Sequence, residues 1–427
     1  MKTQNGMATL LVTVMLLVVS LLFSLASYKN VFYQIKRTQN EVLIRQAHWT
    51  AEGGLECGFA LVNDLKDVDL AKTKLSSKCK VPLNLFSMNI TGSGPYLLTS
   101  ESNIDLAKRL LEKKFNTAGP STSGALKSSS DLYFNGAYTI SPDPNIKESA
   151  TSAKWLCTIL RYKGTVDVDG NVVNQGLIEA KPPYSGFPSS GQSCKSDYQS
   201  TLGSGSWTES TLSPYKDFVY DTSFDPFKDV FTVPRSDWTK VRDSKEFKLL
   251  TGSYVTTSTG NVSYKKLSGC GGGIADAIKA DYDLIWVDGT CELDNNAFTA
   301  IDNAIAGNSK IDGIILVIQD GIFSVRGAHK FPGMIYHLNI SFSPNEFIWN
   351  DMASHSNYPI PAGAPLNKTS YYQSGAFMPA GGYVMDAPGQ IAAFASGMNF
   401  LYNRDLIEKP LTKLRKVIWV EGSWNDI

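Results

Sequence analysis

The feature that most constrains this chain is an uncharged, apolar segment close to its start, from Met7 to Tyr28. A helix over this segment would be roughly 33 Å long at about 1.5 Å per residue, which is enough to cross a bilayer. Three interpretations are open at this point. The segment is a secretory signal peptide cut near Ala26, an uncleaved signal anchor, or the start of a mature chain whose short leader is cut after Gly6.

The segment that follows the apolar run continues a helical pattern. Apolar residues recur at spacings of three, four and seven or eight, at Val31, Phe32, Ile35, Val42, Leu43, Ala47, Ala51, Leu55 and Phe59. Charged residues occupy other positions, and Glu41 can form i,i+4 ion pairs with Arg37 and Arg45. The pattern predicts one helix, transmembrane over residues 7–28 and continuing as an amphipathic stalk over 29–61. A cleaved signal peptide would not be followed by such a stalk.

The opening NGMATLLVTVMLL and the segment RQAHWTAEGGLECG, from Arg45 to Gly58, resemble the PilX-type minor pilins of type IV pili. The tail WVEGSWNDI is similar to the same family. The resemblance implies that residues 1–6 are a leader, and that a prepilin peptidase cuts between Gly6 and Met7 and methylates Met7. It also implies an inner-membrane anchor with the remaining chain in the periplasm, followed by incorporation into a pilus. The implied partners are other minor pilins, the major pilin and the pilus assembly machinery.

One position departs from the family pattern. Most pilins carry Glu as the fifth mature residue, and the fifth residue counted from Met7 here is Leu11. A carboxylate at that depth in hydrocarbon is costly unless it meets a positive partner. In the family that partner is the amino terminus of the neighbouring subunit above. Because Leu11 has no such group, we expect a tip or initiation subunit rather than a repeating one.

Small residues line one side of the expected stalk, at Ala47, Ala51 and Gly54, followed by Leu55. An exposed amphipathic stalk must pack against other stalks, because its apolar face is otherwise left in water. The small residues permit close approach to such a neighbour. They equally make room for a globular head of the same chain, and both interpretations remain open.

The six cysteines fall into three local pairs along the chain. Fifteen connectivities are possible for six cysteines, so a preference for nearby partners is the basis for choosing one. It predicts three disulfides in an oxidising compartment, Cys57–Cys79, Cys157–Cys194 and Cys270–Cys291. No CxxC pair and no zinc-type His/Cys spacing occurs.

The charges that flank the apolar segment argue against the expected orientation. Only Lys2 precedes it, whereas Lys29, Lys36, Arg37 and Arg45 follow it, so the positive-inside rule would place the stalk in the cytoplasm. The paired cysteines and the resemblance both favour the opposite orientation, which we adopt.

The expected fold class is α+β, with the long helix carrying a mostly β head. Residues 62–268 form its variable α/β region. Within this region Ser102 and Asn103 can cap a helix over Ile104–Phe115, with basic residues in its last turn. No ligand follows from this part of the sequence, although pilins commonly place binding functions in such a region.

The segment from Gly164 to Val173 predicts a β-hairpin that turns at Asp169 and Gly170. The side-chain oxygens of Asp167, Asp169 and Asn171 in the same segment also suggest a calcium-binding loop. The segment fits that template poorly, because the glycine comes too early and no acidic residue occupies the twelfth position.

Residues 269–427 form the expected β-helix-like or β-roll region. Apolar runs end at glycine turns near residues 284–289, 313–321, 322–327, 333–336, 375–378 and 390–394. The repeat is loose, so a sandwich remains an alternative. We expect the last apolar segment, Val417–Val420, to close one end of this region.

No motif indicates catalysis, a cofactor or a metal. The four histidines, His48, His329, His337 and His355, are scattered along the sequence, and no G-x-S-x-G, H-E-x-x-H or P-loop occurs. Some β-helix enzymes cut polysaccharides with carboxylates such as those of Asp320 and Asp351, but nothing pairs these two. With 40 basic and 40 acidic residues the chain has no basic excess that would make nucleic acid its main partner. The expected function is therefore pilus assembly, with an adhesion or DNA-uptake role left open.

Three other functions remain open. The chain could be a tip-type pseudopilin of a type II secretion system, a membrane-anchored periplasmic or surface binding protein that never enters a filament, or an anchored β-helix that acts on polysaccharides.

Overall fold

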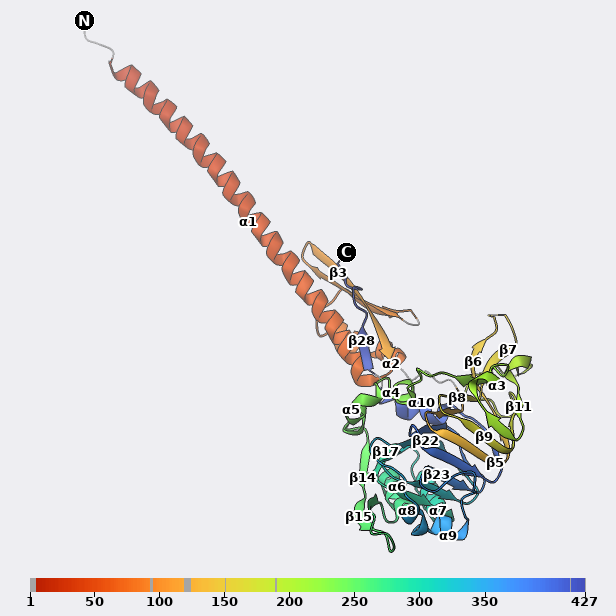
Figure 1. Ribbon diagram of the computed structural model, residues 1–427. Coiled ribbons are helices and arrows are strands. Elements are labelled where there is room, and N and C mark those ends of the chain that lie inside the picture. Colours follow the sequence, from red (N-terminus) through yellow and green to blue (C-terminus); the bar gives the residue numbers. More distant parts are fainter. Residues whose placement is uncertain are drawn as a thin grey trace. The chain divides into compact units, whose positions relative to one another are not determined.

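A computed structural model describes residues 5–92, 95–118, 124–149, 151–188, 190–414 and 416–426. The chain forms two compact units, one made of Met1–Ala118 and Arg415–Ile427 and the other of Gly119–Leu414 (Figure 1). The expected boundary between residues 268 and 269 coincides with neither limit, because strands from both sides of it pair in the same sheets of the second unit. Residues 1–4 of the expected leader, 1–6, lie outside the described residues.

The first unit is built on α1, a single helix of 61 residues from Asn5 to Leu65 (Figure 1). It agrees with the predicted helix and extends it by a turn at its end. Lys66 ends the helix in a left-handed conformation, with φ of 56°. Asp67 then caps the next helix by accepting a hydrogen bond from the backbone N–H of Leu70 at 2.9 Å. The elements that follow are α2 (Val68–Leu75) and the π-helical turn η1 (Ser76–Lys80).

An antiparallel sheet packs on the C-terminal part of α1. Its strands are β1 (Ser87–Thr91), β2 (Tyr96–Ile104), β3 (Ala107–Ala118), β28 (Lys416–Trp419) and β29 (Asn425–Asp426), with β28 and β29 both paired to β3. The predicted helix over Ile104–Phe115 is wrong, because β2 and β3 form a hairpin there that turns at Asp105 and Leu106. Leu111 and Phe115 of β3 are fully buried in the core that this sheet forms with α1. Strand pairing and burial on the helix thus override the good helix propensity of a Leu- and Lys-rich segment.

The last apolar segment also differs from expectation. We expected Val417–Val420 to close one end of the C-terminal region, but its strand β28 pairs with β3 in the first unit, from Lys416 opposite Ala118 to Trp419 opposite Phe115. The ring of Trp419 stacks on Phe59 of α1 with centroids 4.2 Å apart. The end of the chain therefore completes the sheet that covers the helix.

The second unit contains two large sheets whose long strands run parallel. Among the described residues, one sheet has eight strands, in the spatial order β13 (Phe218–Tyr220), β8 (Leu160–Tyr162), β4 (Leu126–Ser128), β25 (Gly382–Asp386), β22 (Gly333–Leu338), β19 (Ile314–Gln319), β17 (Leu284–Asp288) and β14 (Lys248–Thr251). The other follows the order β11 (Thr201–Leu202), β9 (Val166–Asn174), β5 (Asp131–Ile140), β26 (Ile391–Ala395), β23 (Thr369–Ser374), β20 (Phe323–Arg326) and β18 (Cys291–Leu293). To it are added β12 (Gly205–Trp207) on β9 and β27 (Met398–Phe400) on β5. The predicted apolar runs thus become strands, and this part of the chain is rich in β structure.

The order of strands in space differs from their order in the chain. Consecutive strands alternate between the two sheets, as β17 and β18 or β25 and β26 do. The four pairs from the later part of the chain lie next to one another in the stack. Beside them, β4 and β5 from the earlier part pair with β25 and β26. Two segments far apart in sequence therefore build one continuous stack.

The predicted hairpin over Gly164–Val173 is also wrong, because the segment pairs with a distant strand and not with itself. Residues Val166–Asn174 form one uninterrupted strand, β9, that pairs along its full length with β5. Gly170 lies inside β9 opposite Gly136, with φ of 136°, and an added Cβ would lie 2.0 Å from the carbonyl oxygen of Gly136. The glycine thus marks a close approach of two backbones rather than a turn.

Apolar side chains fill the space between the two sheets. Aromatic rings from neighbouring strands form a ladder in which Phe323 lies 5.5 Å from Tyr371, Tyr371 lies 5.2 Å from Phe394, and Phe394 lies 5.0 Å from Phe134. Helices α6 (Cys270–Lys279) and α7 (Asn295–Ala306) contribute to the same core. This core joins the early and the late strands into one folding unit.

The outer face of the eight-stranded sheet is also covered. Helices α4 (Pro226–Phe231), α5 (Trp238–Arg242) and α10 (Asp405–Thr412) supply apolar residues to a second core there. Phe227 of α4 packs 5.8 Å from Tyr336, and Trp286 is fully buried. Because both faces are buried, strands such as β19 read as unbroken apolar runs rather than as alternating ones.

The remaining elements are short. They are β6 (Asp143–Lys147), β7 (Lys154–Thr158), β10 (Ser193–Cys194), η2 (Ser196–Tyr198), α3 (Glu209–Leu212), η3 (Arg235–Asp237), β15 (Ser253–Thr256), β16 (Ser263–Lys266), β21 (His329–Phe331), α8 (Glu346–Asn350), α9 (Ala353–Asn357) and β24 (Phe377–Pro379).

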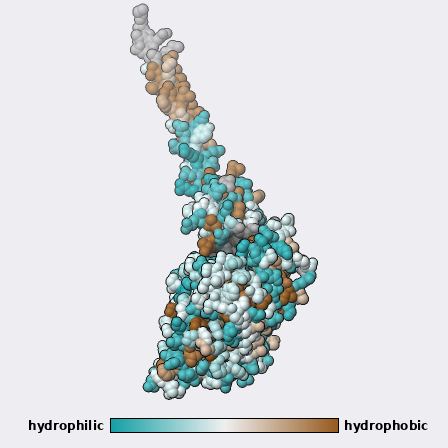
Figure 2. Space-filling model, turned by 45° about the vertical axis from the view of Figure 1, so that its right-hand side comes forward, coloured by the Kyte–Doolittle hydropathy of each residue, from teal (hydrophilic) through white to brown (hydrophobic). Residues whose placement is uncertain are grey.

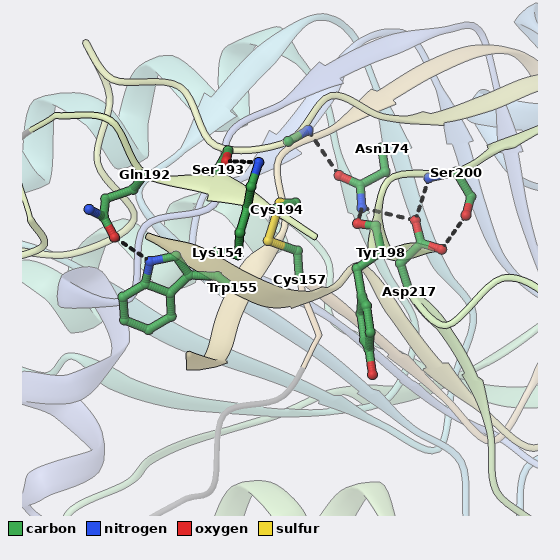
Figure 3. The surroundings of a disulfide bond; sticks show 11 residues. Lys154, Trp155, Cys157, Asn174, Gln192, Ser193, Cys194, Tyr198, Ser200 and Asp217 are labelled. Carbon is green, nitrogen blue, oxygen red and sulfur yellow. Dashed lines mark hydrogen bonds between the residues drawn. A yellow bond between two sulfur atoms is a disulfide. The ribbon is translucent and has the colours of Figure 1, made fainter. Parts of the chain in front are cut away.

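The three disulfides form as predicted, Cys57–Cys79, Cys157–Cys194 and Cys270–Cys291. Figure 3 shows the surroundings of the second. The indole N–H of Trp155 donates to the Gln192 side chain at 2.8 Å, and on the other side of the bond Asp217 accepts from Asn174 at 2.9 Å. This disulfide thus fixes β7 to β10 within a network of side-chain hydrogen bonds.

Candidate functional site

The candidate site is the part of α1 that the first unit leaves uncovered. Every described side chain from Thr9 to Val42 is exposed, including large apolar residues such as Leu10 at 68% and Phe23 at 70%. This helix is long and apolar enough to cross a membrane by length and composition. Figure 2 shows the same division as a brown segment of α1 beside the N-terminus, followed by a mainly teal segment.

The far end of the apolar segment carries aromatic and basic residues. Tyr28 and Phe32 lie 6.4 Å apart between ring centroids, and the ammonium of Lys36 lies 4.8 Å from the Phe32 centroid. Lys29 lies 5.9 Å from the Tyr33 centroid. Amphipathic aromatic and basic side chains are typical of the level at which a spanning helix leaves the hydrocarbon.

The small residues of the stalk face the sheet of their own unit. Ala47 and Ala51 are fully buried and Leu55 is 1% exposed. A Cβ on Gly54 would lie 2.1 Å from the hydroxyl oxygen of Ser100, whereas a Cβ on its neighbour Gly53 would meet nothing within 4 Å. Of the two interpretations left open by the sequence, the structure therefore supports the one in which small residues make room for the chain's own head.

A groove lies between the stalk and the tip of the β2–β3 hairpin. Its volume is about 760 Å³, and Asp105 of the hairpin lines it together with apolar and polar side chains of α1, which are Val31, Ile35, Val42, Leu43, Gln34, Thr38, Gln39 and Gln46. Leu106, the next residue at the tip, is 98% exposed. The apolar residues of this groove and the side chain of Leu106 thus form an uncovered, partly apolar surface. The sequence did not indicate Leu106, because its segment was expected to be helical.

The end of the chain anchors the stalk at His48. Its Nδ1 lies 3.5 Å from a carboxylate oxygen of Asp426, and its ring packs edge-on against Trp424 with centroids 6.0 Å apart. Lys113 places its ammonium 4.1 Å from the centroid of Trp419. The Gly-Ser-Trp tail that contributed to the resemblance thus holds the sheet against the helix.

The residues expected to be processed lie at the start of α1. Gly6 and Met7 fall within the helix, and nothing is described of their side chains. Leu11 is 57% exposed on the uncovered segment.

The other histidines and acidic residues named in the sequence are dispersed in the second unit. Burial lowers the pKa of His337 to about 4, and its Nε2 lies 2.9 Å from the Gly321 carbonyl oxygen. Burial also lowers the pKa of His329, which stacks on Phe298 at 4.4 Å, and that of His355.

The acidic residues of the second unit are held by local hydrogen bonds. Asp320 accepts backbone hydrogen bonds from Ile340, Ser341 and Phe342, and the pKa of Asp351 is lowered by the side-chain and backbone hydrogen bonds from Ser258.

No group of three or more metal-ligating side chains occurs among the described residues. Of the calcium candidates, Asp169 accepts a hydrogen bond from Asn135 at 2.8 Å, and Asp167 accepts one from Ser206. Both lie along β9 with Asn171, in register with β5 rather than around a loop.

The chain was also compared with known proteins. No family model, curated protein or solved structure matches it.

Proposed function

We propose that this chain is a membrane-anchored subunit of a filament, a PilX-like minor pilin that helps to assemble a type IV pilus. A single feature of α1 carries the proposal. Its C-terminal part is packed on the sheet of the first unit, whereas every described side chain from Thr9 to Val42 is exposed. The apolar part of this surface, up to Tyr28, is stable only in lipid or against other helices, and a subunit that moves from a membrane into a helical bundle meets both conditions in turn.

The proposed partners follow from this surface. Other minor pilins and the major pilin would bury the uncovered helix, and the groove beside Leu106 is where a neighbouring stalk enters. The head lies in the periplasm and then on the pilus, which agrees with three disulfides and an oxidising compartment. Leu11 offers no carboxylate to a subunit above, so we place this subunit at or near the filament tip. No enzymatic activity and no cofactor are part of the proposal.

The second unit is, in this proposal, a β-helix-like head. Successive strands alternate between two sheets, and equivalent strands of successive turns pair in parallel, as β17, β19 and β22 do. A stack of this kind presents long, regular side faces that suit contact with a surface or another cell.

The mass of the mature N-terminal peptide, with and without the host's prepilin peptidase, tests the proposal. We expect a peptide that begins at N-methylated Met7 only when the peptidase is present. An intact Met1 start would favour the second candidate, a membrane-anchored binding protein that stays out of filaments. Cleavage near Ala26 would make the chain a released protein and would refute both. Purified filaments with the subunit spread evenly along the shaft would refute the tip placement alone.

A further inference from the structure

A cleft lined by both polar and apolar groups lies in the second unit, where the start of α6 meets β18 and β20. Its volume is about 370 Å³. It shares Asp294, Asn296 and Arg326 with an adjoining open groove of about 750 Å³. The assembly proposed above depends on α1 and makes no use of this cleft.

The start of α6 supplies unpaired backbone donors to the cleft. Gly269 caps the helix in a left-handed conformation, with φ of 65°, and no side chain caps the first N–H groups. Added Cβ atoms on Gly269 and Gly272 would meet nothing within 4 Å, so this side of the helix start faces open space. Gly271, in contrast, packs against Ala297 of α7. A helix start that is open to a cleft presents N–H groups and a partial positive charge to an anion.

A buried hydroxyl in the same cleft points to a ligand independently. Ser324 of β20 lines the cleft and is 1% exposed, and its hydroxyl has no hydrogen-bond partner among the described residues. Buried hydroxyl groups in folded proteins nearly always have a partner. A ligand oxygen in the cleft would supply the missing one.

Two basic side chains complete the lining. Lys266 contacts Glu292 at 2.8 Å, and Arg326 contacts Asp294 at 3.3 Å. Desolvation opposes the charge of Lys266, but the hydrogen bond and the attraction from Glu292 outweigh it, so the pKa of Lys266 is raised and its ammonium persists at neutral pH.

The two acidic partners are already engaged by donors of the protein. Glu292 also lies 3.3 Å from the backbone nitrogen and the hydroxyl of Ser354, and Asp294 accepts the backbone N–H of Ala297 at 3.0 Å. The two ion pairs cancel in charge, which leaves the helix start and Ser324 as unsatisfied donors.

Beside the Asp294–Arg326 ion pair, the adjoining groove is lined by neutral polar groups and one aromatic ring. Tyr358 is 50% exposed at its edge. The amide and hydroxyl side chains beside it are Asn295, Asn296, Asn357, Ser374 and Ser396. Amides and hydroxyls both donate and accept hydrogen bonds, as sugar hydroxyls do, and the flat face of a tyrosine can be covered by a sugar ring.

We propose that the cleft and the adjoining groove bind an acidic saccharide. Its carboxylate lies at the start of α6 against Ser324, Lys266 and Arg326, and its neutral sugar hydroxyls lie along the groove beside Tyr358. A head of this kind would recognise uronic-acid-containing glycans, either as free sugar acids or as part of a polymer.

The test uses the full chain in detergent micelles and isothermal titration calorimetry. The probes are galacturonate, trigalacturonate, galactose, galactotriose and inorganic phosphate. We expect trigalacturonate to bind more tightly than galacturonate if the polymer is the source, and equally if the free sugar acid is. The two neutral sugars are expected to bind at least about tenfold more weakly, because they lack the carboxylate.

Two variants test the site without endangering the fold. Ser324→Ala removes a hydroxyl that the protein itself does not use, and should weaken binding of the acidic probes about tenfold or more. Gly272→Leu fills open space at the cleft and improves helix propensity, and should abolish binding. The matched controls are Ser102→Ala, a buried serine without a partner in the first unit, and Gly53→Leu, a helical glycine with open space beside it. Both controls should bind as the unaltered chain does.

Three results would overturn the proposal. These are equal affinity for acidic and neutral sugars, phosphate binding as tightly as trigalacturonate, or no binding of any acidic probe up to about 10 mM, a concentration above the Kd of even weak specific ligands. None of these results bears on cleavage before Met7, so the assembly proposal would stand or fall separately.

Discussion

Two neighbouring glycines of α1 have opposite surroundings, although the sequence presents them as one Gly-Gly pair. Gly54 is buried against Ser100 and Leu85, and Gly53 faces open space. The same substitution at the two positions therefore has opposite consequences. At Gly53 a side chain improves helix propensity, and at Gly54 it separates the helix from its sheet.

We expect Gly54→Leu to lower the free energy of unfolding of the first unit by about 1–3 kcal/mol or more, because the added side chain has no space between α1 and β2. Gly53→Leu should instead raise it by about 0.5–1 kcal/mol. Hydrogen exchange of the backbone amides of β2 and β3 at increasing denaturant concentration measures both. Equal destabilisation by the two substitutions would contradict the packing described for the stalk.

His337 makes the second unit sensitive to acid. Burial lowers its pKa to about 4 in the folded chain, against the ordinary value of 6.5, and the Gly321 carbonyl and Asp320 only partly offset this. The unfolded chain therefore binds the proton first as the pH falls. The stability that the neutral imidazole provides is complete above about pH 6.5 and is lost towards pH 4, with about 2 kcal/mol gone at pH 5.

Thermal unfolding at pH 7 and pH 5 measures this loss. His337→Gln keeps a side-chain donor at the position without a titrating group, so its stability should fall less between the two pH values. An unchanged difference in the variant would assign the acid sensitivity to other groups.

Single elements show why some predictions succeeded and others failed. The helical period of α1, the spacing of the cysteines and the unbroken apolar runs are local signals. The structure confirms the long helix, the three disulfides and the strands that they predict. The strand β3 was missed because its residues favour a helix when considered alone, and only the packing of Leu111 and Phe115 on α1 makes it a strand. The strand β9 was mistaken for a hairpin because Asp-Gly is a common turn, whereas here its glycine meets another backbone.

The strand β28 belongs to the first unit, and its removal should affect that unit alone. Deleting residues 416–427 removes β28, β29 and the stacking of Trp419 on Phe59. We expect the whole deletion to lower the free energy of unfolding of the first unit by about 3 kcal/mol or more. Hydrogen exchange should then show lost protection in β2 and β3 and unchanged protection in β19 and β22. Loss of protection in β14 and β18 instead would place the tail at the end of the parallel stack.

At the level of the whole molecule, strand order was beyond prediction from the sequence. A repeat of apolar runs indicates that strands stack, but it does not say which stack on which, because parallel pairing is decided by contacts between distant segments. The cleft at the start of α6 could not be predicted for the same reason. Ser324, Lys266 and the start of α6 are unremarkable apart, and only the fold brings them together.

The joined stack predicts that its early part cannot fold alone. A fragment of residues 119–268 contains β4, β5, β8 and β9 but lacks β25 and β26, against which they pair. We expect this fragment to show no cooperative unfolding transition, whereas residues 119–414 show one. Circular dichroism and denaturation of the two fragments make the comparison. A cooperative transition in the shorter fragment would restore the domain boundary after residue 268.

The second unit begins after β3 and ends before β28, and these two strands are antiparallel partners whose ends meet where Ala118 lies opposite Lys416. The whole second unit therefore occupies the position of a hairpin loop. A short turn in its place would leave every strand of the first unit connected. This junction is therefore a place at which one head can be exchanged for another while α1 keeps its own sheet.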